Sequence, residues 1–227
     1  MLVGTLLAVS GAALRGAQLP RSPLVQMSAA EAALLSPSDA QLLELSASDV
    51  RAKTTDELEV LIAELEAAAA NFVDATPDDR PSVTLSRLLA TAHTCYGDHE
   101  LCVPHAKAAL DGGGEDADMH FLLGVAAERR MDEDVALDEY ETAIDLDPKC
   151  WRALFHVGKI ALAFGAIDMG IEHFRKVAEI NPEHAATKAF LTSFDASPAA
   201  EAEDDEDEEN LPLPESLTSF DVDPEGL

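Results

Sequence analysis

The sequence predicts an all-α fold, built as a solenoid of antiparallel helix pairs, and two observations lead to this prediction. The chain is rich in Ala and Leu and only 5% aromatic, a composition that favours helices over a sheet. Two segments between residues 117 and 184 repeat one pattern of apolar and small residues at a spacing of 34. The repeat pairs Gly124 with Gly158, Tyr140 with Phe174, Ala143 with Val177, and Pro148 with Pro182. A repeat of this length is typical of stacked helical units.

Each repeat is predicted to contain two helices. The first helices span about 118–130 and 152–164, and the second helices span about 134–146 and 168–180. The glycine of each first helix lets the second helix cross closely, because a side chain there would hold the backbones apart. Asp134 and Asp168 lie near the starts of the second helices, where negative charge is favourable. The two prolines end their units because proline cannot continue a helix interior.

These residues, in this frame, resemble the tetratricopeptide repeat (TPR) family. The resemblance implies that small and aromatic positions pack the helices together and that prolines mark the unit boundaries. These positions are Ala90, Gly124, Ala136, Tyr140, Ala143, Pro148, Gly158, Phe174 and Pro182. It also implies a non-enzymatic scaffold for protein–protein interaction, such as an assembly or chaperone-like adaptor.

The same frame extends toward the N-terminus. An earlier repeat begins at Val83, with Ala90 at the position of Gly124. This repeat departs from the pattern at Pro104, inside its second helix, and at the glycines 112–114, where we expect a flexible joint. The predicted order is a targeting leader (1–30), N-terminal helices (31–75), three TPR-like repeats (83–184, divided as 83–116, 117–150 and 151–184), a capping helix (185–196) and a disordered acidic tail (197–227).

Residues 1–30 resemble a targeting leader. They contain no Asp or Glu, but they do contain Arg15 and Arg21. The apolar run at 2–9 is typical of a signal-peptide core, and the acid-free, Arg-bearing stretch after it is typical of a transit peptide. This order resembles the bipartite leaders of plastid proteins in algae with secondary plastids, so we predict plastid (chloroplast) localisation. The alternatives are the secretory pathway, the mitochondrion and an untargeted N-terminus, and we expect no membrane span in the mature chain.

The formal net charge of −29 disfavours nucleic-acid binding, which needs clustered Lys and Arg. An acidic chain prefers basic or apolar partners. Eight of the nine residues from 201 to 209 are acidic, and such a block cannot bury a core. We therefore expect the C-terminal tail to be disordered.

The sequence predicts no enzyme, no catalytic residue and no cofactor, because it has no GxSxG motif, no phosphate-binding glycine loop and no paired Cys/His nucleophile. The alternative function is a metal-binding or thiol-redox regulator centred on the turn from His93 to His105. This segment holds three His and two Cys, which suit zinc, and Cys95 with Cys102 could form a redox-sensitive disulfide. Its spacing matches no zinc motif, so ordinary packing is the favoured interpretation and no metal site is predicted.

The TPR resemblance places a concave binding groove on the first helices. The predicted groove residues are Arg87, Thr91, Phe121, Val125, Arg152, Phe155 and Lys159. Three of the fifteen Lys and Arg residues thus face one groove, beside two phenylalanines that we expect to be exposed. The expected ligand is an extended or helical peptide, or a C-terminal segment of a partner, that offers apolar side chains and a carboxylate. Packing of both phenylalanines between the repeats is the alternative. Thr91 and Leu122 stand where family members that clamp chaperone carboxylates carry Asn, so a standard clamp is not predicted.

Overall fold

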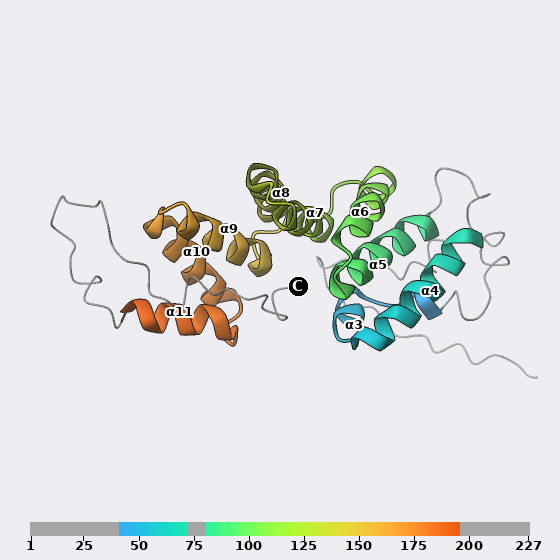
Figure 1. The fold of residues 1–227 in the computed structure, drawn as a ribbon, viewed down its shortest axis with the longest axis horizontal. Coiled ribbons are helices and arrows are strands. Elements are labelled where there is room, and N and C mark those ends of the chain that lie inside the picture. The colour runs from blue at the N-terminus through green and yellow to red at the C-terminus, as the bar shows by residue number, and fades with distance from the viewer. Residues whose placement is uncertain (1–40, 72–79, 196–227) are drawn as a thin grey trace, which may run out of the picture.

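The computed structural model describes residues 41–71 and 80–195, which form helices joined by short turns (Figure 1). The named helices are α3 (Ala47–Arg51), α4 (Thr55–Asn71), α5 (Arg80–Tyr96), α6 (His99–Gly113), α7 (Ala117–Arg129), α8 (Glu133–Leu146), α9 (Trp151–Ala163), α10 (Ile167–Ile180) and α11 (Ala185–Asp195). The all-α prediction is confirmed, since the described part of the chain contains no strand. The predicted leader and acidic tail lie outside the described residues, as do residues 31–40 and 72–79 of the predicted N-terminal and linker segments.

Consecutive helices form antiparallel pairs that follow one another along the long axis of the molecule (Figure 1). The pairs are α5 with α6, α7 with α8, and α9 with α10, and each second helix also contacts the first helix of the next pair. α3 and α4 pack against α5 at one end, and α11 packs against α10 at the other. Such end helices cover apolar faces that the terminal repeats of a solenoid would otherwise expose. No described helix has both the length and the apolar character needed to cross a membrane.

The helix pairs interlock where a glycine of the first helix meets a ring of the second. A Cβ atom on Gly124 would lie 2.5 Å from a ring carbon of Tyr140, and one on Gly158 would lie 2.9 Å from a ring carbon of Phe174. Both rings are fully buried, as are Ala90, Ala136 and Ala143. The absence of a side chain therefore sets the distance between the two helices of a pair.

The two prolines at the ends of the repeats have a different role from the other packing positions. Pro148 and Pro182 lie in the turns after α8 and α10, and both are exposed. They stop the helices without contributing to the core.

The first repeat differs from the expectation at its glycines. Gly112 and Gly113 belong to α6, and a Cβ on either would lie 2.7 Å from a methyl carbon of Val83. Gly114 follows them with a φ of 78° and ends the helix. Two of the three glycines thus allow close packing of α6 on α5, where we expected a joint. Pro104 stays inside α6, which continues past it.

Candidate peptide-binding face

The first helices α5, α7 and α9 carry the predicted groove, but four of its seven residues are buried. Phe121 and Phe155 are 0% and 2% exposed, and Thr91 and Val125 are equally inaccessible. The prediction that the two phenylalanines are exposed is therefore wrong. Phe121 packs 5.9 Å from the ring of Tyr140, and Phe155 packs 5.3 Å from the ring of Phe174. Aromatic pairs at these separations stabilise a core, so each ring holds the two helices of its own repeat together. Phe121 also contacts His156 of the next repeat, with 5.7 Å between the ring centroids.

Only the three cations of the predicted groove remain accessible, and Arg87 is the first of them. Its guanidinium forms an ion pair with Asp116 at 2.5 Å. Asp116 is held in place by the backbone, because it caps α7 by accepting hydrogen bonds from the N–H groups of Asp118 (2.9 Å) and Met119 (3.3 Å). The start of α7 thus fixes the position of the carboxylate that Arg87 meets.

A second arginine, which the sequence did not point to, lies beside this one. Arg51 is the last residue of α3, and its guanidinium donates to the carboxylate of Asp118 at 3.3 Å. Packing of α3 on α5 brings it to the start of α7. No signal in the sequence could have placed it there, because α3 lies outside the repeats and a solvated surface arginine would look the same.

Arg152, in the first turn of α9, completes the group. Its guanidinium lies over the ring of Trp151, 5.2 Å from the centroid. Burial lowers the pKa of Arg152, the nearby charge of Arg51 lowers it further, and Asp118 partly offsets both effects. Among the described residues, Arg152 has no carboxylate within ion-pair distance.

We call Arg51, Arg87, Arg152, Asp116 and Asp118 the arginine cluster. Three positive and two negative charges leave it with an excess of one positive charge in a strongly acidic chain. The Nε–H group of each arginine is buried and has no hydrogen-bond partner within the described part of the chain. Most buried polar groups are paired, so these three donors set the arginine cluster apart from an ordinary surface ion-pair group.

The third predicted cation, Lys159, does not share this property. Its ammonium group lies 3.2 Å from Glu128 Oε1, and the other oxygen of Glu128 accepts a hydrogen bond from the Tyr140 hydroxyl at 2.7 Å. His156 Nδ1 lies 2.6 Å from the same oxygen. Because a carboxylate only accepts, this geometry requires the proton of His156 to be on Nδ1.

The network around Glu128 is held together electrostatically. Burial alone would raise the pKa of Glu128, but the hydrogen bond and charge of His156, the charge of Lys159 and the hydroxyl of Tyr140 outweigh it and hold that pKa well below its usual value. Burial and the charge of Glu128 raise the pKa of Tyr140. The network ties the second repeat to the third. The positive charge of Lys159 is already paired with Glu128, so this lysine is not a candidate for binding a ligand carboxylate.

The His and Cys side chains of the turn from His93 to His105 pack against other residues and form no metal site or disulfide. The rings of His93 and His105 stack at 5.4 Å, and burial lowers the pKa of both. Cys95 and Cys102 are free thiols, so the disulfide considered as an alternative is not formed. Burial raises the pKa of both thiols. Within the described residues, no group of three or more His, Cys, Asp or Glu side chains could hold a metal ion.

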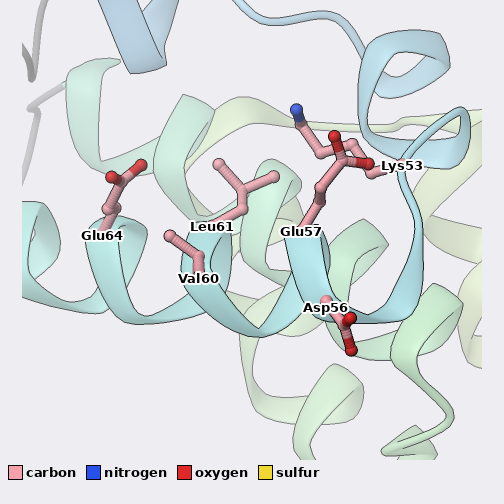
Figure 2. Close-up of a pocket in the computed structure, with 6 residues that line it drawn as sticks. All are labelled: Lys53, Asp56, Glu57, Val60, Leu61 and Glu64. Carbon is pink, nitrogen blue, oxygen red and sulfur yellow. The ribbon is translucent and has the colours of Figure 1, made fainter.

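A hollow of about 420 Å³ lies elsewhere, along the start of α4 (Figure 2). Figure 2 shows Val60 and Leu61 on one turn of the helix, with Glu57 and Glu64 on either side. Glu57 accepts hydrogen bonds from the backbone N–H (2.8 Å) and the hydroxyl (3.0 Å) of Thr54. The Glu57 carboxylate therefore stabilises the start of α4. The hollow shares no residue with the arginine cluster.

Comparison with known proteins agrees with the repeat seen in the structure. Over 98 residues the chain is 35% identical to Tetratricopeptide repeat protein 12 of Homo sapiens, a match that covers 41% of this chain and 14% of that protein. The chain is a tetratricopeptide repeat protein. No family model matches it.

A second similar protein is Protein bimA of Emericella nidulans, which is 32% identical to this TPR protein over 73 residues. That match covers 30% of this chain and 9% of bimA, so the chain spans only a small part of either curated relative. Among solved structures, MamA is 18% identical with a TM-score of 0.46, covering 65% of this chain and 91% of MamA. YrrB, described as a TPR protein with an unusual peptide-binding site, is 20% identical with a TM-score of 0.46, covering 64% of this chain and 74% of YrrB.

Proposed function

We propose that this protein is an interaction scaffold that binds a partner peptide through a carboxylate at the arginine cluster. The observation that carries the proposal is the set of three buried Nε–H donors without a partner, on Arg51, Arg87 and Arg152. The rest of the predicted groove no longer supports an apolar pocket, since Phe121 and Phe155 are core residues. The proposed site is therefore polar and lies toward the starts of α7 and α9.

A carboxylate suits the site for a physical reason. A guanidinium presents its N–H groups in a planar fork that matches the two oxygens of a carboxylate. Arg51 and Arg87 each already meet one aspartate, whereas Arg152 faces Arg51 without a carboxylate of its own. An incoming carboxylate would relieve the repulsion between Arg51 and Arg152 and would satisfy donors that are now unpaired. Arg152 is the residue on which binding should depend most.

The test uses the full chain and a displayed library of peptides with free C-termini. Selected peptides are synthesised as free acids and as amides, and their dissociation constants are measured by fluorescence anisotropy. We expect amidation to weaken binding to the unmodified chain by about tenfold or more, the value of a hydrogen-bonded charge pair. Arg152→Gln should bind both forms equally and weakly.

Arg175→Gln is the matched control, because Arg175 is exposed on α10 and its loss changes the net charge by the same amount. This variant should bind like the unmodified chain. Free acids and amides that bind alike, or an Arg152→Gln variant of unchanged affinity, would show that the cluster is not the peptide site.

A further inference from the structure

The turn between the two helices of each repeat has the same conformation in all three repeats. Gly97, Met131 and Gly165 occupy equivalent positions, 34 residues apart, and their φ angles are 103°, 60° and 79°. A positive φ is ordinary for glycine but is strained for a residue with a side chain. Met131 is the only non-glycine residue of the described chain with a positive φ, and it is 84% exposed. The fold thus holds an apolar side chain outward at a position that favours glycine.

Exposed apolar residues gather at these turns. The first repeat exposes Tyr96 and Leu101, the second exposes Met131 and Val135, and the third exposes Phe164 and Met169. Leu101, Val135 and Met169 are equivalent positions, and so are Tyr96 and Phe164. Single exposed apolar residues are common on protein surfaces, but recurrence at one repeat position is not random scatter.

Stacking of the repeats places these six residues on one side of the molecule, which we call the turn edge. Within every repeat the chain turns from first to second helix at this edge, and it passes to the next repeat at the opposite edge. Each repeat contacts its neighbour, so equivalent residues form a row along the stack. The row is an apolar surface that the described part of the chain leaves uncovered.

A row of carboxylates accompanies the apolar row. Glu100, Asp134 and Asp168 each directly precede one of the apolar residues and are also 34 residues apart. All three are exposed, and no ion pair of the described chain engages them. A ligand of this edge would meet an apolar strip bordered by negative charge.

We propose that the turn edge binds a basic amphipathic helix of a partner protein. An amphipathic helix offers an apolar stripe along its length, and Lys or Arg beside that stripe would meet the carboxylate row. The negative charge along this edge disfavours two other occupants, a second copy of this chain and an anionic membrane. A second copy of this chain would set carboxylates against carboxylates, and an anionic membrane would be repelled in the same way. The turn edge shares no residue with the arginine cluster, so the two surfaces are independent.

The test uses two synthetic amphipathic helices with the same Leu face, one carrying only Lys and the other only Glu on its polar face. Binding to the full chain is measured by fluorescence anisotropy at about physiological salt, where distant charges are screened. The decisive variant is Met131→Gln combined with Met169→Gln, which removes apolar surface and leaves every charge in place. We expect the Leu/Lys helix to bind the unmodified chain at least about tenfold more tightly than this variant. The Leu/Glu helix should bind the unmodified chain about tenfold or more weakly than the Leu/Lys helix.

The matched control is Leu146→Gln combined with Ile180→Gln. These residues are exposed, equivalent in the second and third repeats, and located at the ends of α8 and α10, on the opposite edge. The control variant should bind the Leu/Lys helix like the unmodified chain, and circular dichroism should show native helicity in every variant.

Three results would overturn the proposal. Unchanged binding by the methionine variant would mean that overall acidity attracts the helix. Equal losses in the methionine and control variants would mean unspecific apolar adsorption. A dimer in sedimentation velocity that dissociates only in the methionine variant would identify a second copy as the occupant.

Discussion

Replacement of Met131 by glycine should make the protein more stable, although it removes a large side chain. A residue with a Cβ atom in the left-handed conformation costs about 1–2 kcal/mol. Glycine avoids this cost but loses about 0.5–1 kcal/mol more conformational entropy on folding. Because the Met131 side chain is 84% exposed, its loss removes little packing. The net expected effect is a gain of about 0.5–1 kcal/mol in the free energy of unfolding.

The measurement is urea unfolding followed by far-UV circular dichroism, with thermal unfolding as a second probe. For a domain of this size the gain corresponds to a rise in Tm of about 1–4 °C. Gly165→Ala is the reciprocal control, because a Cβ there would have no atom within 4 Å and would therefore add only backbone strain. We expect it to lower stability by about 1 kcal/mol. If Met131→Gly lowers the free energy of unfolding, the exposed side chain supports the turn and the strain argument is wrong.

Substitutions at three other positions test the packing, the helix cap and a buried histidine. Gly124→Ala should destabilise by about 1–2 kcal/mol in urea unfolding, because its Cβ would press on the buried Tyr140 ring and outweigh the helix propensity of alanine; an unchanged midpoint would contradict this. Asp116→Ala should cost about 1–2 kcal/mol in the same assay, whereas Asp116→Asn, which keeps a capping oxygen, should cost less; equal losses would assign the effect to the Arg87 ion pair. Burial lowers the pKa of His93, so as pH falls below about 6.5 the unfolded chain takes up the proton first and stability is lost. The Tm of His93→Leu should therefore rise relative to the unmodified chain between about pH 7 and about pH 5, and a constant difference would refute it.

The local sequence determined most of the secondary structure. Glycine, aromatic and proline positions at a fixed spacing predicted the second and third repeats, and α7 and α9 begin one residue before the predicted starts. These features were predictable because each depends on residues a few positions apart: a proline that stops a helix, an aspartate in the first turn, or a glycine under a ring. The confirmed fold class follows from such local rules combined with the repeat.

Which residues of the first helices are buried depends on contacts between helices that cannot be read from the sequence. In α9, nine of thirteen residues are buried, because a first helix is packed by its own second helix and by neighbouring repeats. Its apolar pattern therefore covers most of its circumference, and periodicity alone cannot separate a groove residue from a core residue. Phe121 and Phe155 were assigned to the wrong surface for this reason.

Charge pairing was likewise decided by tertiary structure. Lys159 and Glu128 are 31 residues apart in the sequence, yet Lys159 Nζ lies 3.2 Å from Glu128 Oε1. Arg51 and Asp118 are 67 residues apart, yet Arg51 Nη2 lies 3.3 Å from Asp118 Oδ1. The sequence determined how many cations the first helices carry. Only the packing of α3 on α5, and of the second repeat on the third, decided which of them are neutralised and which retain unpaired donors, because those distances depend on the whole stack.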